Sequence, residues 1–169
     1  QAEHDPRARA IMVTTSESLA NAVSDEVERQ LKLLPRESIA RPAIENNSYI
    51  AVMDSVEDMF TVMNEVAPEH LEIQLPDPMG YMSLVQNAGS VFLGAYASEP
   101  LGDYVGGTNH VLPTSGTARF SSPLGVYDFV KRTSFTQFTK ERLEEVATHI
   151  TTLARTEGLE AHARAIEVR

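Results

Sequence analysis

Two adjacent side chains, Glu69 and His70, are the first candidates for proton-transfer chemistry. A carboxylate next to an imidazole provides two groups that can accept a proton near neutral pH. The pair stands between a predicted helix and a predicted strand, and open α/β sheets often place ligand-binding side chains at such junctions. The dipeptide alone does not establish catalysis. Glu69 could instead form a structural ion pair, and His70 could fill a gap in the packing.

A glycine-rich segment carries the next candidates. Seven of the nine Gly lie between Gly89 and Gly125, and we expect residues 95–125 to form a long loop, of a kind that is usually functional or disordered. Asp103 and His110 lie in this segment, seven residues apart, and we expect it to be too rich in glycine for a helix. A turn in which Asp103 bonds its own backbone is the alternative. The chain has neither G-x-G-x-x-G nor G-x-x-x-x-G-K-[ST], the phosphate-binding signatures.

The two ends of the chain offer side chains that could bind a metal ion. Gln1 and His4 share a face if the chain begins as a helix, and Glu157 and His162 stand on either side of Gly158. There is no Cys, so a zinc site has to combine His nitrogens with carboxylate or amide oxygens, at about 2.0–2.2 Å. One such set is Gln1, His4, Asp103 and His162. Its members are scattered along the chain, so their spacing alone does not single out a metal site.

The composition narrows the class of protein. The chain has 169 residues, 42% hydrophobic and 22% charged, which is typical of one globular domain with at most a small appendage. A net charge of −10, with no Lys/Arg cluster, argues against nucleic-acid binding. No apolar run is long enough to span a membrane, and no signal-peptide pattern opens the chain. We therefore expect a cytoplasmic protein, and a start at Gln1 without Met indicates a processed or fragmentary chain.

Short β-type runs alternate with helical patterns over most of the chain, which is typical of βαβ units and a mainly parallel sheet. We expect strands at residues 10–14, 49–53, 71–75 and 90–93. Helical spacing predicts helices over residues 19–34 and 56–66, with a short helix after Pro78. These patterns predict a Rossmann-like α/β domain with an incomplete sheet.

The chain becomes helical after residue 125, where an apolar stripe extends over residues 143–154. Gly158 closes this helix, and residues 159–168 begin another. We therefore divide the chain into an α/β domain at residues 1–124 and a helical arm at residues 125–169, of a kind that often packs on a neighbouring subunit.

The chain resembles the C-terminal part of the histidinol dehydrogenases, and the likeness covers essentially all 169 residues. Several long and unusual motifs carry it, in the order that the family has them. They are residues 1–5 (QAEHD), 67–72 (APEHLE), 87–90 (NAGS), 102–104 (GDY), 109–114 (NHVLPT), 118–122 (ARFSS) and 157–162 (EGLEAH).

The resemblance implies an NAD-dependent zinc enzyme that oxidises L-histidinol to L-histidine in two hydride transfers, by way of an aldehyde. Glu69 and His70 correspond to the proton acceptors. The positions of the zinc ligands are those of Gln1, His4, Asp103 and His162. The positions that meet substrate are those of Gln1, His4, His70, Asp103, His110, Glu157 and His162.

The resemblance also implies partners outside this chain. Family members are much longer, and their N-terminal half is expected to supply another Rossmann-like domain with most of the NAD contacts. In a homodimer of the family the helical arm crosses to the other subunit, so Glu157 and His162 would complete the partner's site. We therefore expect the chain by itself to have little or no dehydrogenase activity.

Two other functions remain open at this point. One is a non-catalytic interaction module that keeps the fold and the helical arm for dimer formation. The other is an unrelated zinc hydrolase with Glu69 as its base, which would not need a nicotinamide cofactor. Zinc analysis and an NADH assay with histidinol separate the three.

Overall fold

The computed structural model describes residues 1–169 and contains two compact units, which are treated separately below. Unit 1 comprises residues 1–129 and unit 2 comprises residues 130–169, so the division falls at residue 129 rather than at the expected 124. The difference arises because a short 3-10 helix, η3 (Val126–Phe129), belongs with the first unit. None of the helices combines the length and the apolar character needed to cross a membrane.

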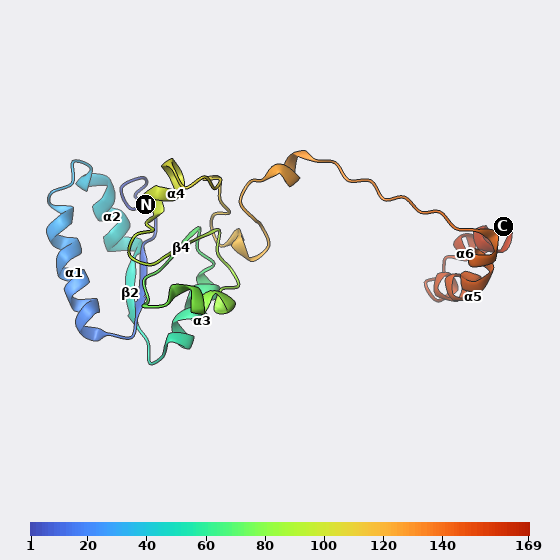
Figure 1. The fold of residues 1–169 in the computed structure, drawn as a ribbon, viewed down its shortest axis with the longest axis horizontal. Coiled ribbons are helices and arrows are strands. Elements are labelled where there is room, and N and C mark those ends of the chain that lie inside the picture. The colour runs from blue at the N-terminus through green and yellow to red at the C-terminus, as the bar shows by residue number, and fades with distance from the viewer. The chain divides into compact units, whose positions relative to one another are not determined.

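The first half of unit 1 is a two-stranded parallel sheet with helices packed beside it. Strand β1 (Ile11–Thr14) pairs with β2 (Tyr49–Val52), with Ile11 opposite Tyr49. Helices α1 (Glu17–Leu31) and α2 (Glu37–Asn47) connect the two strands and lie next to each other (Figure 1). The α1 N-terminus forms at Ser16, whose hydroxyl accepts a hydrogen bond from the Leu19 amide at 3.2 Å.

The second half of unit 1 is a similar parallel pair, and it carries the core. Strand β3 (His70–Ile73) pairs with β4 (Ser90–Leu93) after helix α3 (Val56–Val66), with the 3-10 helix η1 (Pro78–Leu84) between the strands. Leu71 and Ile73 are buried against Phe60 of α3. Burial of such side chains contributes roughly 1.5–3 kcal/mol each to stability. Because successive residues of a strand point to opposite faces, the other two residues of β3, His70 and Glu72, lie on the face away from this core.

Helix α4 (Glu99–Tyr104) covers that other face, and its presence corrects an expectation. The segment around Asp103 was expected to be a loop too rich in glycine for a helix, and this was wrong. Pro100 lies in the first turn, where a missing amide hydrogen costs nothing, and Gly102 lets the helix backbone lie close to the ring of Phe92. The other helical element of the expected loop is the short 3-10 helix η2 (Thr117–Arg119).

Two further differences concern helix positions. Helix α2 has no counterpart in the sequence-based prediction, because Pro42 lies inside it and interrupts the pattern expected of a helix. The expected helical arm is also not continuous after residue 125, since only the short η3 follows there, residues 130–139 contain no helix or strand, and α5 (Lys140–Thr156) begins after them. The four expected strands and the mainly parallel pairing are confirmed.

Unit 2 is a pair of helices joined at a glycine. Helix α5 ends at Thr156 and α6 (Glu160–Glu167) follows, with Gly158 between them at a φ of +75° that favours glycine. Ala154 of α5 and Ala163 of α6 are buried between the helices. Arg155 adds a polar link, because its guanidinium bonds Glu160 at 3.0 and 3.2 Å and Glu167 at 2.8 Å.

The Arg155 cluster predicts that unit 2 loses stability in acid. Hydrogen bonds from Arg155, then Arg164, lower the pKa of Glu160 below its ordinary 4.5. A lowered pKa in the folded state stabilises the fold above pH 4.5, and this contribution is lost as the pH falls through the folded pKa. We expect the denaturant midpoint of the Ala163 amide signal, followed by NMR, to fall between pH 7 and pH 3. Glu160→Gln should lower the midpoint at pH 7 and reduce its pH dependence; equal midpoints at the two pH values in the parent chain would contradict this.

Candidate metal and proton-transfer site

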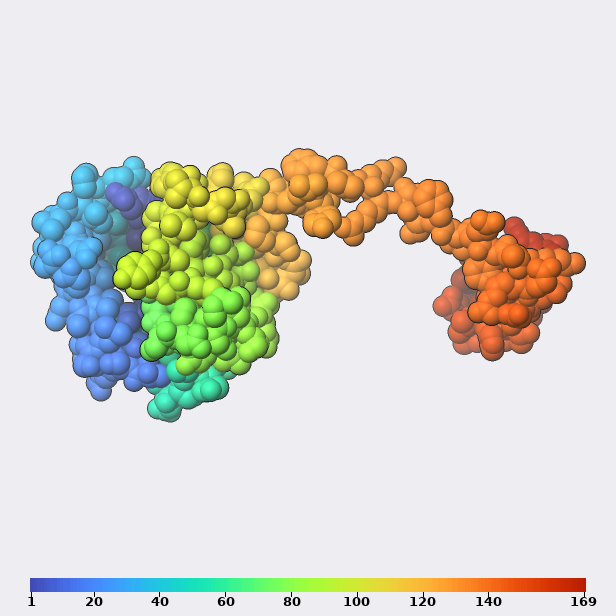
Figure 2. Space-filling model, viewed as in Figure 1, coloured from blue at the N-terminus to red at the C-terminus, as the bar shows by residue number.

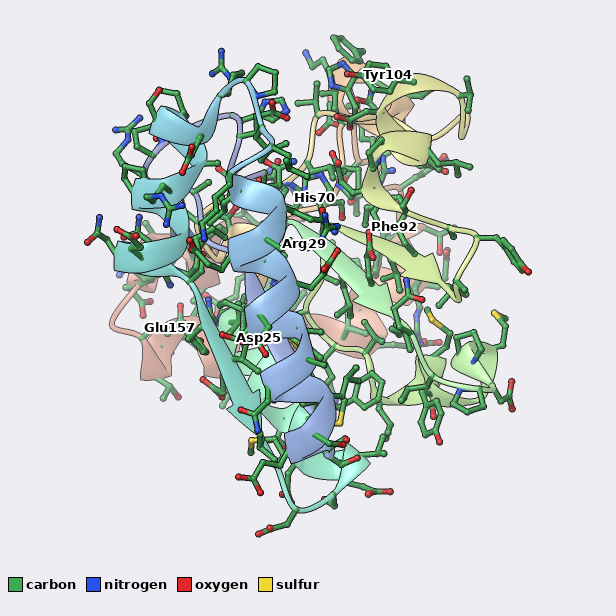
Figure 3. All side chains as sticks on the ribbon, turned by 90° about the vertical axis from the view of Figure 1, so that its left-hand side faces the viewer. Asp25, Arg29, His70, Phe92, Tyr104 and Glu157 are labelled. Atoms are coloured by element: carbon green, nitrogen blue, oxygen red, sulfur yellow. The ribbon has the colours of Figure 1, made fainter.

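Strand β3 presents polar side chains on the face away from the core. Leu71 and Ile73 point into the core, so His70 and Glu72 lie on the opposite face. The ring of His70 packs near that of Phe92 on β4, with 6.2 Å between the ring centroids. Figure 3 shows these two side chains together on neighbouring strands. The same alternation that buries the core therefore places the imidazole of His70 under α4.

Helix α4 brings two carboxylates to this imidazole. The Nε2 atom of His70 lies 3.7 Å from Oε1 of Glu99, and the two side chains are only 12% and 18% exposed. Asp103 is one helical turn after Glu99, on the same side of the helix. One donor atom from each of His70, Glu99 and Asp103 lies within 4.8 Å of the other two. One nitrogen and two oxygens thus converge within the reach of a single ion.

The start of the chain reaches the same carboxylate. The side-chain amide of Gln1 donates a hydrogen bond to Oε1 of Glu99 at 3.1 Å. The N-terminal residues and the segment that contains α4 accordingly lie side by side in Figures 1 and 2. Glu99 therefore contacts both Gln1 and His70, which are far apart in the sequence.

The segment that carries Gln1 and His4 is held by α2. The His4 amide donates to the Gln1 carbonyl at 3.0 Å and closes a turn. Arg36, at the beginning of α2, donates to the Glu3 carbonyl at 3.0 Å, and Asn47, at its end, donates to the Pro6 carbonyl at 2.9 Å. The helix absent from the sequence-based prediction is thus one of the elements that position this end of the chain.

A local ion pair stabilises the next turn of this segment. The side chain of Arg7 forms two hydrogen bonds with the carboxylate of Asp5, at 3.1 and 2.9 Å. Side-chain and backbone hydrogen bonds from Arg7 lower the pKa of Asp5 to about 2. Asp5 is therefore ionised at any pH at which the chain is expected to work.

The end of α3 determines where strand β3, which begins at His70, enters the sheet. Ala67 takes a left-handed conformation, with φ of 49°, and turns the chain out of the helix toward β3. Arg119 stabilises this end, because its guanidinium donates to the Glu65 carbonyl and, at 2.9 Å, to the Gly116 carbonyl. The last carbonyl groups of a helix have no amide partner within the helix, so they need donors from outside it. The motif at residues 118–122 therefore has a structural role next to the site.

The structure does not gather all the predicted site residues. Gln1, His70 and Asp103 join the cluster around Glu99. Glu69 is partly buried and its side chain has no hydrogen bond or ion pair, whereas His4 and His110 are exposed and have none either. Glu157, at the end of α5, and His162, on α6, are exposed residues of unit 2.

Glu99 was missed by the sequence-based prediction, although it has the most contacts in the cluster. It bonds Gln1, faces His70 and lies within reach of Asp103. The available signal was its spacing of four residues from Asp103, which places two carboxylates on one side of a helix. A spacing of four residues places two side chains on one side only in a helix, and this segment was expected to be a loop.

Comparisons with known proteins identify the family that the motifs indicate. The family model described as histidinol dehydrogenase matches residues 1–169. The chain belongs to the histidinol dehydrogenase family. It is 68% identical to the histidinol dehydrogenase of Lactiplantibacillus plantarum and 61% identical to that of Streptococcus mutans, in each case over all 169 residues.

The chain covers only part of these relatives. It spans 40% of the length of both histidinol dehydrogenases. The crystal structure of histidinol dehydrogenase from Elizabethkingia anophelis matches 99% of the chain and 38% of that protein, with a TM-score of 0.86 and 38% sequence identity. The family and the α/β fold are thereby established.

Proposed function

We propose that this chain is the metal-binding and proton-accepting segment of an NAD-dependent histidinol dehydrogenase, which oxidises L-histidinol to L-histidine. The observation that carries the proposal is the convergence of His70, Glu99 and Asp103 with Gln1 on one face of β3, in a chain of this family. A base beside a group of metal donors suits the oxidation of a chelating amino alcohol, because the base can take the hydroxyl proton while the metal donors hold an ion that orients the substrate.

The donor set suits zinc. His nitrogens with carboxylate and amide oxygens are ordinary zinc ligands, and His4, Asp103 and Gln1 supply one of each. Of these residues, Asp103 lies in the group of three donor atoms within 4.8 Å of one another, and Gln1 bonds Glu99 of that group. We propose Gln1, His4 and Asp103 as ligands, with the partner subunit's His162 completing the set. Zinc would orient the amine and the imidazole of histidinol, which are both good metal donors. Glu99 holds the amide of Gln1 and lies between it and His70.

His70 and Glu69 are proposed as the proton acceptors. A primary alcohol can lose a hydride only if its hydroxyl proton also leaves, so a base must lie within hydrogen-bond reach of that hydroxyl. The aldehyde product must add water before it can be oxidised again, and the resulting hydrate loses a second proton. His70 supplies the nitrogen of the cluster, and its Nε2 atom lies 3.7 Å from Oε1 of Glu99. Glu69 directly precedes it and has a side chain free of other polar partners.

NAD, when bound, would supply the hydride acceptor for the two oxidations. This chain has no G-x-G-x-x-G fingerprint, and we propose that most dinucleotide contacts come from the part of the relatives that it does not span. We also propose a homodimer in the cytoplasm, acting in histidine biosynthesis, in which Glu157 and His162 serve the partner's site and His110 is a further substrate contact.

A zinc analysis and an NADH assay with L-histidinol test this function. We expect little or no NADH from the chain alone, and turnover when the remaining part of a relative is co-expressed with it. His70→Asn and Glu69→Gln should each lower that turnover more than about threefold, since general acid–base groups usually contribute far more. His149→Asn, on an exposed face of α5, is the matched control.

Three outcomes of this assay would each contradict a part of the proposal. Zinc binding without any turnover in the co-expressed protein would favour the interaction module. Turnover that is insensitive to both substitutions would remove the two residues from the proton-accepting role. Rapid NADH production by the chain alone would show that the dinucleotide contacts lie within these 169 residues.

A further inference from the structure

Glu72 has a contact that nothing in the proposed reaction uses. It lies on β3 two residues after His70, on the same face of the strand. Its Oε1 atom accepts a hydrogen bond from the Glu99 amide at 2.9 Å, across 27 positions of sequence. Its Oε2 atom accepts one from the side-chain amide of Gln74 at 3.2 Å. The carboxylate is therefore held by Gln74, the residue directly after its strand, and directed at the first residue of α4.

Helix α4 needs this acceptor because it has no cap of its own. Ser98 precedes the helix without forming a side-chain cap hydrogen bond. Pro100 has no amide hydrogen, and the Leu101 amide donates to the Ser98 carbonyl at 3.0 Å. The Glu99 amide therefore takes its acceptor from another element. A carboxylate at a helix N-terminus is also favoured by the charge that the helix presents there.

The same hydrogen bond holds the residue at the centre of the candidate metal site. The backbone of Glu99 is held by Glu72, while its side chain contacts His70 and Gln1. Asp103 follows one turn later on this short helix, so a shift of the helix end moves both carboxylates together. The middle of α4 rests on Phe92, where a Cβ at Gly102 would come within 2.8 Å of the ring. One polar contact and one close steric contact thus place α4 on the sheet.

We propose that Glu72 is a positioning residue: its carboxylate fixes the N-terminus of α4 on β3 and thereby sets the distance of Glu99 and Asp103 from His70. The effect on metal binding rests on the proposed function, whereas the position of α4 on β3 can be measured without any metal. Residues that orient metal ligands usually change metal affinity by about 10–100-fold when they are replaced.

The test compares Glu72→Met with Glu72→Gln. Met removes the acceptor at similar size, whereas the Gln carbonyl oxygen can still accept from the Glu99 amide. Glu65→Met is the matched control, since it makes the same change at an exposed Glu whose side chain has no polar partner. Three quantities are measured on the whole chain: hydrogen exchange of the Glu99 amide, NOEs between the His70 ring and the Glu99 side chain, and Zn²⁺ affinity by calorimetry.

We expect Glu72→Met to expose the Glu99 amide, to lose the His70–Glu99 NOEs and to weaken Zn²⁺ binding by about 10–100-fold. Glu72→Gln should restore all three, and Glu65→Met should match the parent chain. The proposal is overturned if Glu72→Met leaves the exchange and the NOEs unchanged. It is also overturned if Glu72→Gln protects the Glu99 amide but binds Zn²⁺ as weakly as the Met variant, because charge rather than position would then be responsible.

The readouts separate this proposal from the proposed function. A parent chain that binds no Zn²⁺ would contradict the metal site. The exchange and NOE measurements would still decide the role of Glu72, since neither of them involves the metal.

Discussion

Replacing Asp103 by Ala is expected to weaken Zn²⁺ binding to the chain by at least about 100-fold, the upper end of the range for residues that only orient a ligand. Asp103 and Gln1 belong both to the ligand set implied by the family motifs and to the cluster around Glu99, and of these two only Asp103 has a carboxylate. Its loss therefore removes a direct oxygen donor on either assignment of the remaining ligands. Calorimetry with Zn²⁺ alone measures the effect.

The matched control for Asp103 is Asp25→Ala. Asp25 lies on the exposed side of α1, as Figure 3 shows, and its side chain has no polar partner. We expect this variant to bind Zn²⁺ as the parent chain does. Equal affinities for Asp103→Ala and Asp25→Ala would show that the carboxylate of Asp103 is not a ligand.

Gly89→Ala is expected to have the largest effect on folding. Gly89 lies directly before β4, and a Cβ there would come within 2.6 Å of the Glu69 carbonyl oxygen and 3.1 Å of the Pro113 ring. The Gly89 and Ser90 amides donate to the Pro68 and Glu69 carbonyls, so the clash lies at the beginning of the strand pairing. Overpacking of this kind usually costs about 1–3 kcal/mol, measured as the free energy of unfolding in urea.

The Gly89 substitution should also displace the site, because Glu69 and His70 begin the strand that it pushes away. Gly125→Ala is the control, since a Cβ at that position meets nothing closer than 3.9 Å. Unfolding free energies for Gly89→Ala and Gly125→Ala that agree within experimental error would contradict the close approach of the backbone at Gly89.

The strands and the parallel pairing could be predicted because their signals are local. Runs such as residues 11–14 and 90–93 combine apolar and β-branched residues, and the helical pattern between them indicates βαβ units. Helix α2 was not predictable in this way, since Pro42 is a strong breaker whose effect the surrounding structure overrides. Helix α4 depends on a tertiary contact, because Glu72 supplies the cap that its own Ser98 does not.

The candidate site could be predicted in part. The sequence alone identifies His70 and Asp103 as chemically capable, but their proximity depends on a helix that the glycine content argued against. Glu99 became a candidate only once that helix was seen. For His4, His110, Glu157 and His162 the motifs remain the basis of the proposed roles, since their side chains are exposed and stand outside the cluster.

The location of bound zinc tests the account most directly. Anomalous diffraction at the zinc edge, from crystals of the chain grown with Zn²⁺ and histidinol, would show which side chains bind the ion. The account predicts one principal peak at about 2.0–2.2 Å from an Asp103 oxygen, next to Gln1 and under α4, with only nitrogen and oxygen ligands. A principal peak elsewhere, with Asp103 and Gln1 free of metal, would contradict it.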